Sequence, residues 1–215
     1  MSVLLPVPAD ARPRRLVQLY AGLAVYGFSS ALLVEAALGL DPWDVLHQGL
    51  SRQTDVSIGT CTIAVGIVVL LLWIPLQQRP GLGTVSNAIL IGLAVDGSLA
   101  LLPAPPNLLW QWGFLLSGIV LNGVATGAYI GAGLGPGPRD GLMTGIAGRG
   151  HSIRLVRTGL EVVVLGAGWT LGGSVGIGTV AYALGIGPLA HVFIPAFTVG
   201  RAGPAVPPDT HTSIP

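Results

Sequence analysis

The stretch Gly39–Leu46, GLDPWDVL, decides the fold because it returns 96 residues later as Gly135–Leu142, GPGPRDGL. Each copy follows a long apolar run and shares a glycine, a proline and an aspartate two residues after the proline. Glycine ends a helix well, proline suits the first position of the next helix, and an aspartate there faces free backbone N–H groups. The repeat therefore predicts two broken helices, in which Asp44 and Asp140 accept backbone N–H bonds.

The composition of the chain is that of an integral membrane protein. Its 215 residues are 51% apolar and 9% charged, with a mean hydropathy of +0.74, whereas a soluble domain is about one-quarter charged. A net charge of +1 indicates no nucleic-acid surface, so the lipid bilayer is the first expected partner. The single cysteine, Cys61, allows neither an internal disulfide nor a thiolate metal site. We expect no cofactor and no metal.

Six apolar segments have the length, about 17 to 25 residues, that crosses a ~30 Å hydrocarbon core as a helix. They are Leu16–Leu38, Ser57–Leu76, Thr84–Leu102, Leu108–Leu134, Ile153–Leu171 and Thr179–Phe197. Two shorter amphipathic pieces, Pro42–Arg52 and Pro138–Arg149, cannot span at ~1.5 Å per residue. The ends, residues 1–15 and 200–215, are rich in proline, charge and hydroxyl groups and are expected to be disordered tails. We expect the first span to be retained rather than cleaved as a signal peptide.

The two halves of the chain match beyond the quoted stretch. Gly81–Val85, GLGTV, returns as Gly176–Val180, GIGTV. A duplication explains this order and predicts two three-helix repeats, residues 16–102 and residues 108–199. Because three crossings are an odd number, the second repeat is expected to lie inverted relative to the first. The short pieces then enter the membrane from opposite faces, as in many secondary transporters, or lie flat at each surface, and the sequence leaves both open.

Arginine placement predicts the orientation, since basic residues near span ends are retained in the cytoplasm. With the N-terminus inside, Arg52 alone falls outside, and the other nine arginines fall on the cytoplasmic side: Arg12, Arg14, Arg15, Arg79, Arg139, Arg149, Arg154, Arg157 and Arg201. Both tails are therefore expected to be cytoplasmic.

Three segments, Pro42–Leu50, Gly137–Met143 and Ser152–Arg157, carry a family resemblance. Their sequences, PWDVLHQGL, GPRDGLM and SIRLVR, resemble the YczE/YyaS/YitT group of bacterial membrane proteins, and the likeness runs from Leu16 to Phe197. The resemblance implies a multi-pass protein of the bacterial inner membrane. It implies no activity, because the members of the group are mostly of undetermined function.

The broken helices hold the first candidates for a substrate or ion pathway, Asp44, Asp140 and Arg139. Helix capping alone explains the two aspartates, and cytoplasmic anchoring explains Arg139, whose place in the first copy is taken by Trp43. A guanidinium beside a helix N-terminus also offers donors to a carboxylate or a phosphate. The position therefore allows a small anion or an ion as the substrate.

Charged residues and histidines within a membrane span cost free energy because they leave water. The predicted spans contain six of them, which are the remaining candidates for the substrate or ion pathway: Glu35, Asp96, Arg154, Arg157, Glu161 and His191. Arg157 and Glu161 are spaced for an ion pair on one helix face. Glu161 is therefore explained either by a role in the pathway or by compensation of the Arg157 charge. Asp96 and His191 occupy equivalent repeat positions. They suit a proton relay or, alternatively, internal hydrogen bonds that hold helices together.

The fourth predicted span carries glycine at every fourth position, namely Gly123, Gly127, Gly131 and Gly135. Small residues at this spacing form a flat stripe on a helix, which lets a neighbouring backbone approach closely. The stripe predicts tight helix packing rather than a site.

These features favour an all-α permease or transporter of a small solute, with a pathway between two inverted repeats. The alternative is a non-transporting membrane partner that stabilises or regulates another membrane assembly. With either function, the protein could bind a second copy of itself, as a homo-oligomer, or another membrane protein. We do not expect the protein to be an enzyme and assign no catalytic residue, because the sequence contains no convincing nucleophile or metal site.

Overall fold

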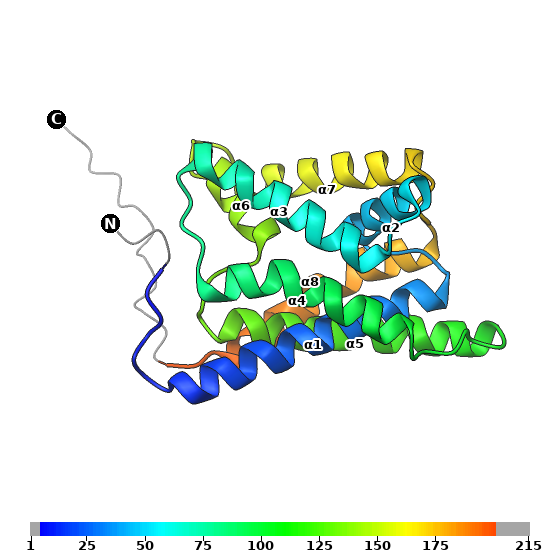
Figure 1. Cartoon of the computed structure of the whole chain (residues 1–215), viewed down its shortest axis with the longest axis horizontal. Coiled ribbons are helices and arrows are strands. Elements are labelled where there is room, and N and C mark those ends of the chain that lie inside the picture. The colour runs from blue at the N-terminus through cyan, green and yellow to red at the C-terminus, as the bar shows by residue number, and fades with distance from the viewer. Residues whose placement is uncertain (1–4, 201–215) are drawn as a thin grey trace.

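A computed structural model describes residues 5–200, and Arg201 with the rest of the C-terminal tail lies outside that range. The described residues form eight α-helices and no strand (Figure 1), which confirms the all-helical prediction. The helices are α1 Arg12–Ala36, α2 Pro42–Thr54, α3 Ile58–Leu76, α4 Leu82–Leu99, α5 Leu108–Gly131, α6 Pro138–Ala147, α7 Ile153–Thr170 and α8 Ile177–Phe197.

Five of the helices, α1, α3, α4, α5 and α8, are long and apolar enough to cross a membrane. The sixth predicted span forms α7, which has the necessary 18 residues but is not among these five. Arg154, Arg157 and Glu161 lie within α7 and lower its hydropathy, because charged side chains are the least favourable residues in lipid.

The two short helices begin after a glycine that turns the chain. Gly39 and Gly135 have φ angles of +110° and +117°, a conformation that glycine adopts without the steric cost other residues pay. The Asp41 side chain caps α2, whereas α6 begins after Gly137 and has no side-chain cap. The prediction that Asp44 and Asp140 accept the first N–H bonds is therefore wrong. A capping side chain belongs to the residue before the first helical position, and that residue is Asp41.

The helices form two layers (Figure 1). In one layer α1 packs against α4 and α5, and α5 packs against α8; in the other α2 packs against α7, and α3 packs against α6. Helix α3 also packs against α4 and joins the layers, while α7 and α8, at the corresponding place in the second half, make little contact. The layers are therefore closed on the side of the first half and open on the side of the second.

The two halves contact each other through matching backbone bonds. Gly83 N donates to the Leu134 carbonyl oxygen over 2.7 Å, and Gly178 N donates to the Leu38 carbonyl oxygen over 2.7 Å. In each case the break after the first long helix of one half meets the start of the last helix of the other. A β-carbon at Gly176 would lie 2.5 Å from the Leu38 oxygen, so these crossings need glycine.

Three glycines of the predicted stripe, Gly123, Gly127 and Gly131, pack against α8 as expected, whereas Gly135 lies beyond the end of α5 and faces Gly81 and Thr84. A β-carbon placed on Gly123, Gly127 or Gly131 would lie 2.6–2.7 Å from atoms of α8. The α8 residues that occupy this space are Leu189, Phe193 and Phe197. The stripe therefore allows a close approach of two long helices, and its role is structural.

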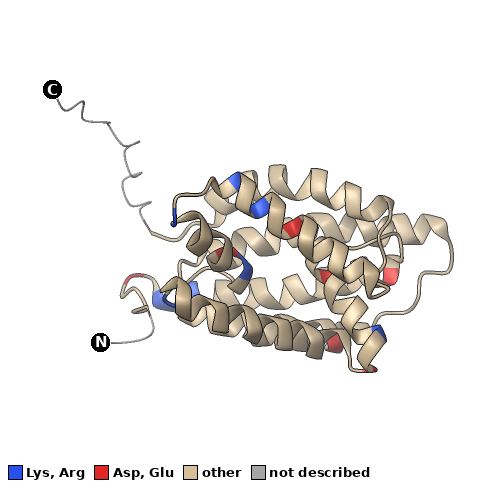
Figure 2. Ribbon diagram, turned by 90° about the horizontal axis from the view of Figure 1, so that it is seen from above, with Lys and Arg blue, Asp and Glu red and all other residues tan. Residues whose placement is uncertain are grey.

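Basic residues gather at the end of the bundle that carries the described termini (Figure 2), whereas Arg52 lies in the last turn of α2. Arg52 donates to the Gly172 carbonyl oxygen and ties α2 to the α7–α8 loop, whereas Arg149 Nη2 donates to Pro75 oxygen over 2.5 Å at the basic end. Arg15 is buried and its Nη1 donates to the Ala132 oxygen over 2.8 Å. Its hydrogen bond to Asp10 holds the pKa of that carboxyl below its ordinary value.

Candidate functional site

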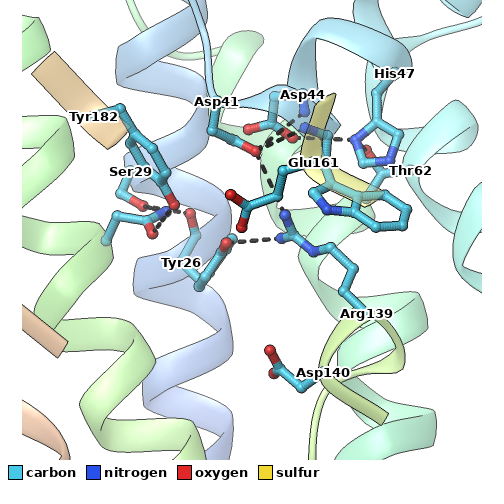
Figure 3. Close-up of polar contacts among 12 residues, drawn as sticks. Tyr26, Ser29, Asp41, Asp44, His47, Thr62, Arg139, Asp140, Glu161 and Tyr182 are labelled. Carbon is cyan, nitrogen blue, oxygen red and sulfur yellow. Dashed lines mark hydrogen bonds and ion pairs between the residues drawn. The ribbon is translucent and has the colours of Figure 1, made fainter. Parts of the chain in front are cut away.

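Arg139, at the start of α6, joins the two broken helices (Figure 3). Its Nη2 donates to the Tyr26 hydroxyl over 2.7 Å, and its Nη1 lies 3.5 Å from Asp41 Oδ1. The guanidinium carbon lies 5.6 Å from the Trp43 ring centroid and 5.7 Å from that of Tyr26, within the range of cation–π attraction. Positions 43 and 139, which correspond in the repeat, are thus brought into contact.

Asp41 is the functional candidate that the sequence reasoning missed. It is 1% exposed, and its Oδ1 accepts hydrogen bonds from the Trp43 and Asp44 backbone nitrogens at 3.0 and 3.3 Å. An aspartate directly before a proline that starts a helix is the signal that could have found it. The same oxygen faces Arg139, so one carboxylate caps α2 and pairs with α6.

Asp44 points away from the helix start and toward α3. Its Oδ1 lies 3.1 Å from His47 Nδ1, and that nitrogen lies 3.2 Å from Thr62 Oγ1 on α3. His47 is 3% exposed, so the three side chains form a buried polar chain between α2 and α3. The sequence reasoning singled out Asp44 and passed over His47, one helical turn further along the same face.

Asp140 accepts a hydrogen bond from a tyrosine of α5. The Tyr129 hydroxyl donates to Asp140 Oδ2 over 2.9 Å, and the Tyr129 ring meets the Tyr26 ring edge to face, with centroids 6.1 Å apart. Beside them the Tyr182 hydroxyl donates to Asn122 Oδ1 over 2.9 Å. The tyrosines of α1, α5 and α8 thus form one wall of the site.

A cavity of about 380 Å³ lies in front of these residues. Its polar lining includes Arg139, Asp140, Arg157 and Glu161, and its apolar lining on α8 includes Ile186 and Ile194. The exposed members of the lining all belong to α7 and α8, namely Arg157, Ala183 and Gly187. The cavity therefore opens between the two helices that make little contact with each other.

Residues 13–195 match the model of DUF6198, which is described as a family of unknown function. The chain belongs to this family.

Three relatives of this DUF6198 protein come from bacteria. An uncharacterized protein of Haemophilus influenzae is 43% identical over 173 residues, which cover 80% of this chain and 79% of the relative. The uncharacterized membrane protein YczE of Bacillus subtilis is 34% identical, covering 82% and 83% of the two chains. YyaS of the same organism is 26% identical, covering 81% and 89%. No solved structure matches the chain.

The resemblance to the YczE and YyaS proteins is thereby confirmed. Together with the apolar helices, it identifies this DUF6198 chain as a membrane protein.

Two predicted site residues, Asp96 and His191, lie outside the cavity. Asp96 accepts hydrogen bonds from Ser57 Oγ at 2.6 Å and from Gly59 N at 2.8 Å, so it ties α4 to the start of α3. His191 is exposed on α8, and within the described residues no contact joins it to Asp96. These contacts match internal hydrogen bonding for Asp96 and do not assemble the proton relay.

Four further predicted residues are at least partly exposed, namely Glu35, Arg154, Arg157 and Glu161. Arg157 Nε donates to Glu161 Oε1 over 3.0 Å, the pairing expected from their spacing, and both side chains reach the mouth of the cavity. Arg154 is exposed on α7, one turn before Arg157. Glu35 is partly exposed near the end of α1 and does not line the cavity. The site therefore has a charged mouth and a buried charged base.

Proposed function

We propose that this DUF6198 protein is a permease or transporter of a small solute, with a pathway between two inverted three-helix repeats. The observation that carries the proposal is the contact between Arg139, which lines the 380 Å³ cavity, and Asp41, so that one residue from each broken helix meets beside the cavity. Secondary transporters with inverted repeats place broken helices around a site near the middle of the membrane.

The matching contacts of the two halves support the inverted arrangement. The Gly83–Leu134 and Gly178–Leu38 bonds correspond in the repeat, and so do the α3–α6 and α7–α2 packings. Burial of the α2 residues Trp43, Asp44, Val45 and His47 supports an α2 that enters the bundle rather than one lying flat on its surface. In this proposal α7 is the sixth span, with its charges turned to the cavity mouth.

The distribution of arginine supports an orientation with both termini in the cytoplasm of the bacterial cell. The basic end of the bundle then faces the cytoplasm, in line with the retention of positive charge on that side. Arg157 and Glu161 accordingly lie on the cytoplasmic part of the pathway. The cavity opens between α7 and α8 toward that side and toward the surrounding lipid.

Unused hydrogen-bonding groups at the base of the cavity support binding of a polar solute. Trp43 Nε1 is a buried donor without a partner among the described residues, and Trp43 lines the cavity. A buried donor that lacks a partner costs about 1–3 kcal/mol, a cost that an acceptor on a bound solute would remove. Arg139 offers further donors, so a small carboxylate or phosphate is the solute class that fits.

A thermal-shift panel followed by a flux assay tests the proposal. Small carboxylates, phosphates and amino acids are screened against the purified protein, because a solute that binds only the folded state raises its Tm. Uptake of the solute that raises Tm is then measured in proteoliposomes. We expect Arg139→Gln to abolish both the Tm shift and the flux, while Arg154→Gln, at an exposed site outside the cavity, retains both.

Flux that persists in a folded Arg139→Gln variant would contradict the assignment of the site. A panel without any stabilising solute and without flux would contradict transport of this solute class. The non-transporting membrane partner would then be the function to test, by asking whether a defined membrane protein co-purifies with the chain.

A further inference from the structure

Two buried carboxylates lie beside Arg139, the permanent positive charge that lines the cavity. Asp41 and Asp44, which we call the acid pair, are 1% and 5% exposed. Arg139 is the guanidinium that faces them, and it contacts Asp41. If both members of the acid pair were ionised and His47 neutral, the cluster would hold a net negative charge. Ionised groups removed from water are strongly disfavoured unless their charge is compensated.

Each member of the acid pair has one carboxyl oxygen that is already used. Asp41 Oδ1 accepts from two backbone nitrogens and faces Arg139, and Asp44 Oδ1 lies beside His47 Nδ1. The two remaining oxygens, Asp41 Oδ2 and Asp44 Oδ2, are buried and have no hydrogen-bond partner among the described residues. The acid pair therefore contains two acceptors and lacks a donor.

The two carboxyl groups are neighbours on the first turn of α2. Asp44 N donates to Asp41 Oδ1 over 3.3 Å, and Figure 3 draws the two labelled side chains near each other. A single proton held by the two carboxyl groups would supply the missing donor and the missing positive charge. Two carboxylates in one low-dielectric site commonly hold one proton between them.

The groups around the acid pair do not replace that proton. Besides Arg139, the titratable side chains around the acid pair and the cavity beside it are Tyr26 of α1, His47 of α2, Tyr129 of α5, Asp140 of α6, Arg157 and Glu161 of α7 and Tyr182 of α8. The positive charge of Arg157 is already paired with Glu161 over 3.0 Å. Helix α3 contributes the uncharged Thr62. Within residues 5–200 no group of three or more His, Cys, Asp or Glu could hold a metal ion, so the donor set suits a proton rather than a metal.

We propose that Asp41 and Asp44 bind one exchangeable proton at neutral pH. The proton joins Asp41 Oδ2 and Asp44 Oδ2, and its release leaves the acid pair with one uncompensated negative charge. That charge strengthens the electrostatic attraction between the acid pair and the Arg139 guanidinium. An anion that binds Arg139 competes with Asp41 for the guanidinium. Protonation of the acid pair weakens that competition, so anion binding and proton binding each raise the affinity for the other.

The role of this proton as the coupling ion rests on the proposed function; the proton site itself does not. If transport occurs, an anionic solute and the proton enter together, and the pair releases both on the other side of the membrane. This arrangement places the coupling group in the first broken helix and the solute-binding guanidinium in the second.

Infrared titration of the full-length protein in nanodiscs tests the proton site. We expect a carbonyl-stretch band of a protonated carboxyl at neutral pH, which shifts when the aspartates carry carbon-13 and disappears as the pH is raised. Asp41→Asn and Asp44→Asn should each lose the band. Asp96→Asn is the matched control, because both oxygens of Asp96 already accept hydrogen bonds, and it should keep the band.

Three results would overturn the proton site. They are a wild-type protein without the band, a band that survives in both Asp41→Asn and Asp44→Asn, and a spectrum in which His47 carries the proton as an imidazolium. The carbon-13 label reports on the wild-type protein, so the test does not depend on the folding of a variant.

Flux under an imposed pH gradient tests the coupling separately. We expect inward flux of the stabilising anion to rise several-fold when the outside is made acidic, and this gain to be lost in Asp44→Asn. A band without any flux leaves the proton site standing and contradicts transport. Flux that does not respond to the gradient contradicts coupling alone.

Discussion

At the scale of single residues, the site depends on a position where the two corresponding stretches of sequence differ. Trp43 and Arg139 correspond in the repeat, and the sequence comparison could only record that the arginine had no counterpart. In the fold the two meet, with the guanidinium carbon 5.6 Å from the Trp43 ring centroid. A symmetric pair of arginines here would repel, and a symmetric pair of tryptophans would leave Asp41 unpaired. The difference between the halves therefore creates the contact.

We predict that Arg139→Gln destabilises the protein more than an ordinary surface change. Removing one partner of a buried ion pair leaves the other charge uncompensated, at a cost of about 3 kcal/mol. The double variant Arg139→Gln with Asp41→Asn should recover most of that loss, since the stranded charge is removed with it. Equilibrium unfolding in detergent measures both effects.

The control for this prediction is Arg154→Gln on the exposed face of α7. It should change the free energy of unfolding by less than about 0.5 kcal/mol. An Arg139→Gln variant as stable as this control, or a double variant no more stable than Arg139→Gln alone, would show that the Arg139–Asp41 contact contributes little to stability.

At the scale of helices, glycine decides which pairs can approach closely. Gly127 of α5 faces Phe193 of α8 so tightly that an added β-carbon would lie 2.7 Å from the Phe193 carbonyl oxygen. Gly113, on the same helix, has nothing within 4 Å of such a carbon. The packing therefore requires glycine at position 127 but leaves room for a side chain at position 113.

We predict that Gly127→Ala destabilises the bundle by about 1–3 kcal/mol, the usual cost of overpacking a tight contact. The obstacle is backbone, which cannot rotate away. Gly113→Ala should be neutral or stabilise by up to about 1 kcal/mol, because alanine favours the helix. Unfolding midpoints of the two variants measure the difference, and equal midpoints would contradict the packing of α5 on α8.

At the scale of the whole molecule, the two layers are joined on one side and separated on the other. Helix α3 packs against α4, whereas α7 and α8 leave the cavity open between them. The bundle is thus closed along α3 and α4 and open along α7 and α8. The open side is where the charged mouth residues of α7 meet the apolar residues of α8.

We predict that the α4–α5 loop faces the outside of the cell and the α6–α7 loop faces the cytoplasm. In a Cys61→Ala background, Ala104→Cys should react with a membrane-impermeant maleimide in intact cells. His151→Cys should react only after the membrane is opened. Both sites are exposed, so accessibility is set by the membrane. Labelling of both sites from one face would contradict the inverted repeats, and exchanged labelling would contradict the orientation.

The sequence by itself determined the helices and the places where they break. Apolar runs of spanning length, and the glycine and proline that punctuate them, act through the local backbone, so the predicted segments agree with the helices of the structure to within a few residues. The glycine stripe of α5 was readable for the same reason, because its spacing belongs to one helix.

Only the tertiary structure decided which charged groups form the site. Asp41 and Arg139 are separated by 98 positions in the chain, and Asp96 finds Ser57 on another helix rather than the equivalent residue of the other half. Spacing along a helix says which residues share a face, but not which helix that face will meet. The partner of a buried charge is set by how the layers stack, because desolvation makes every such group depend on its nearest neighbour in space.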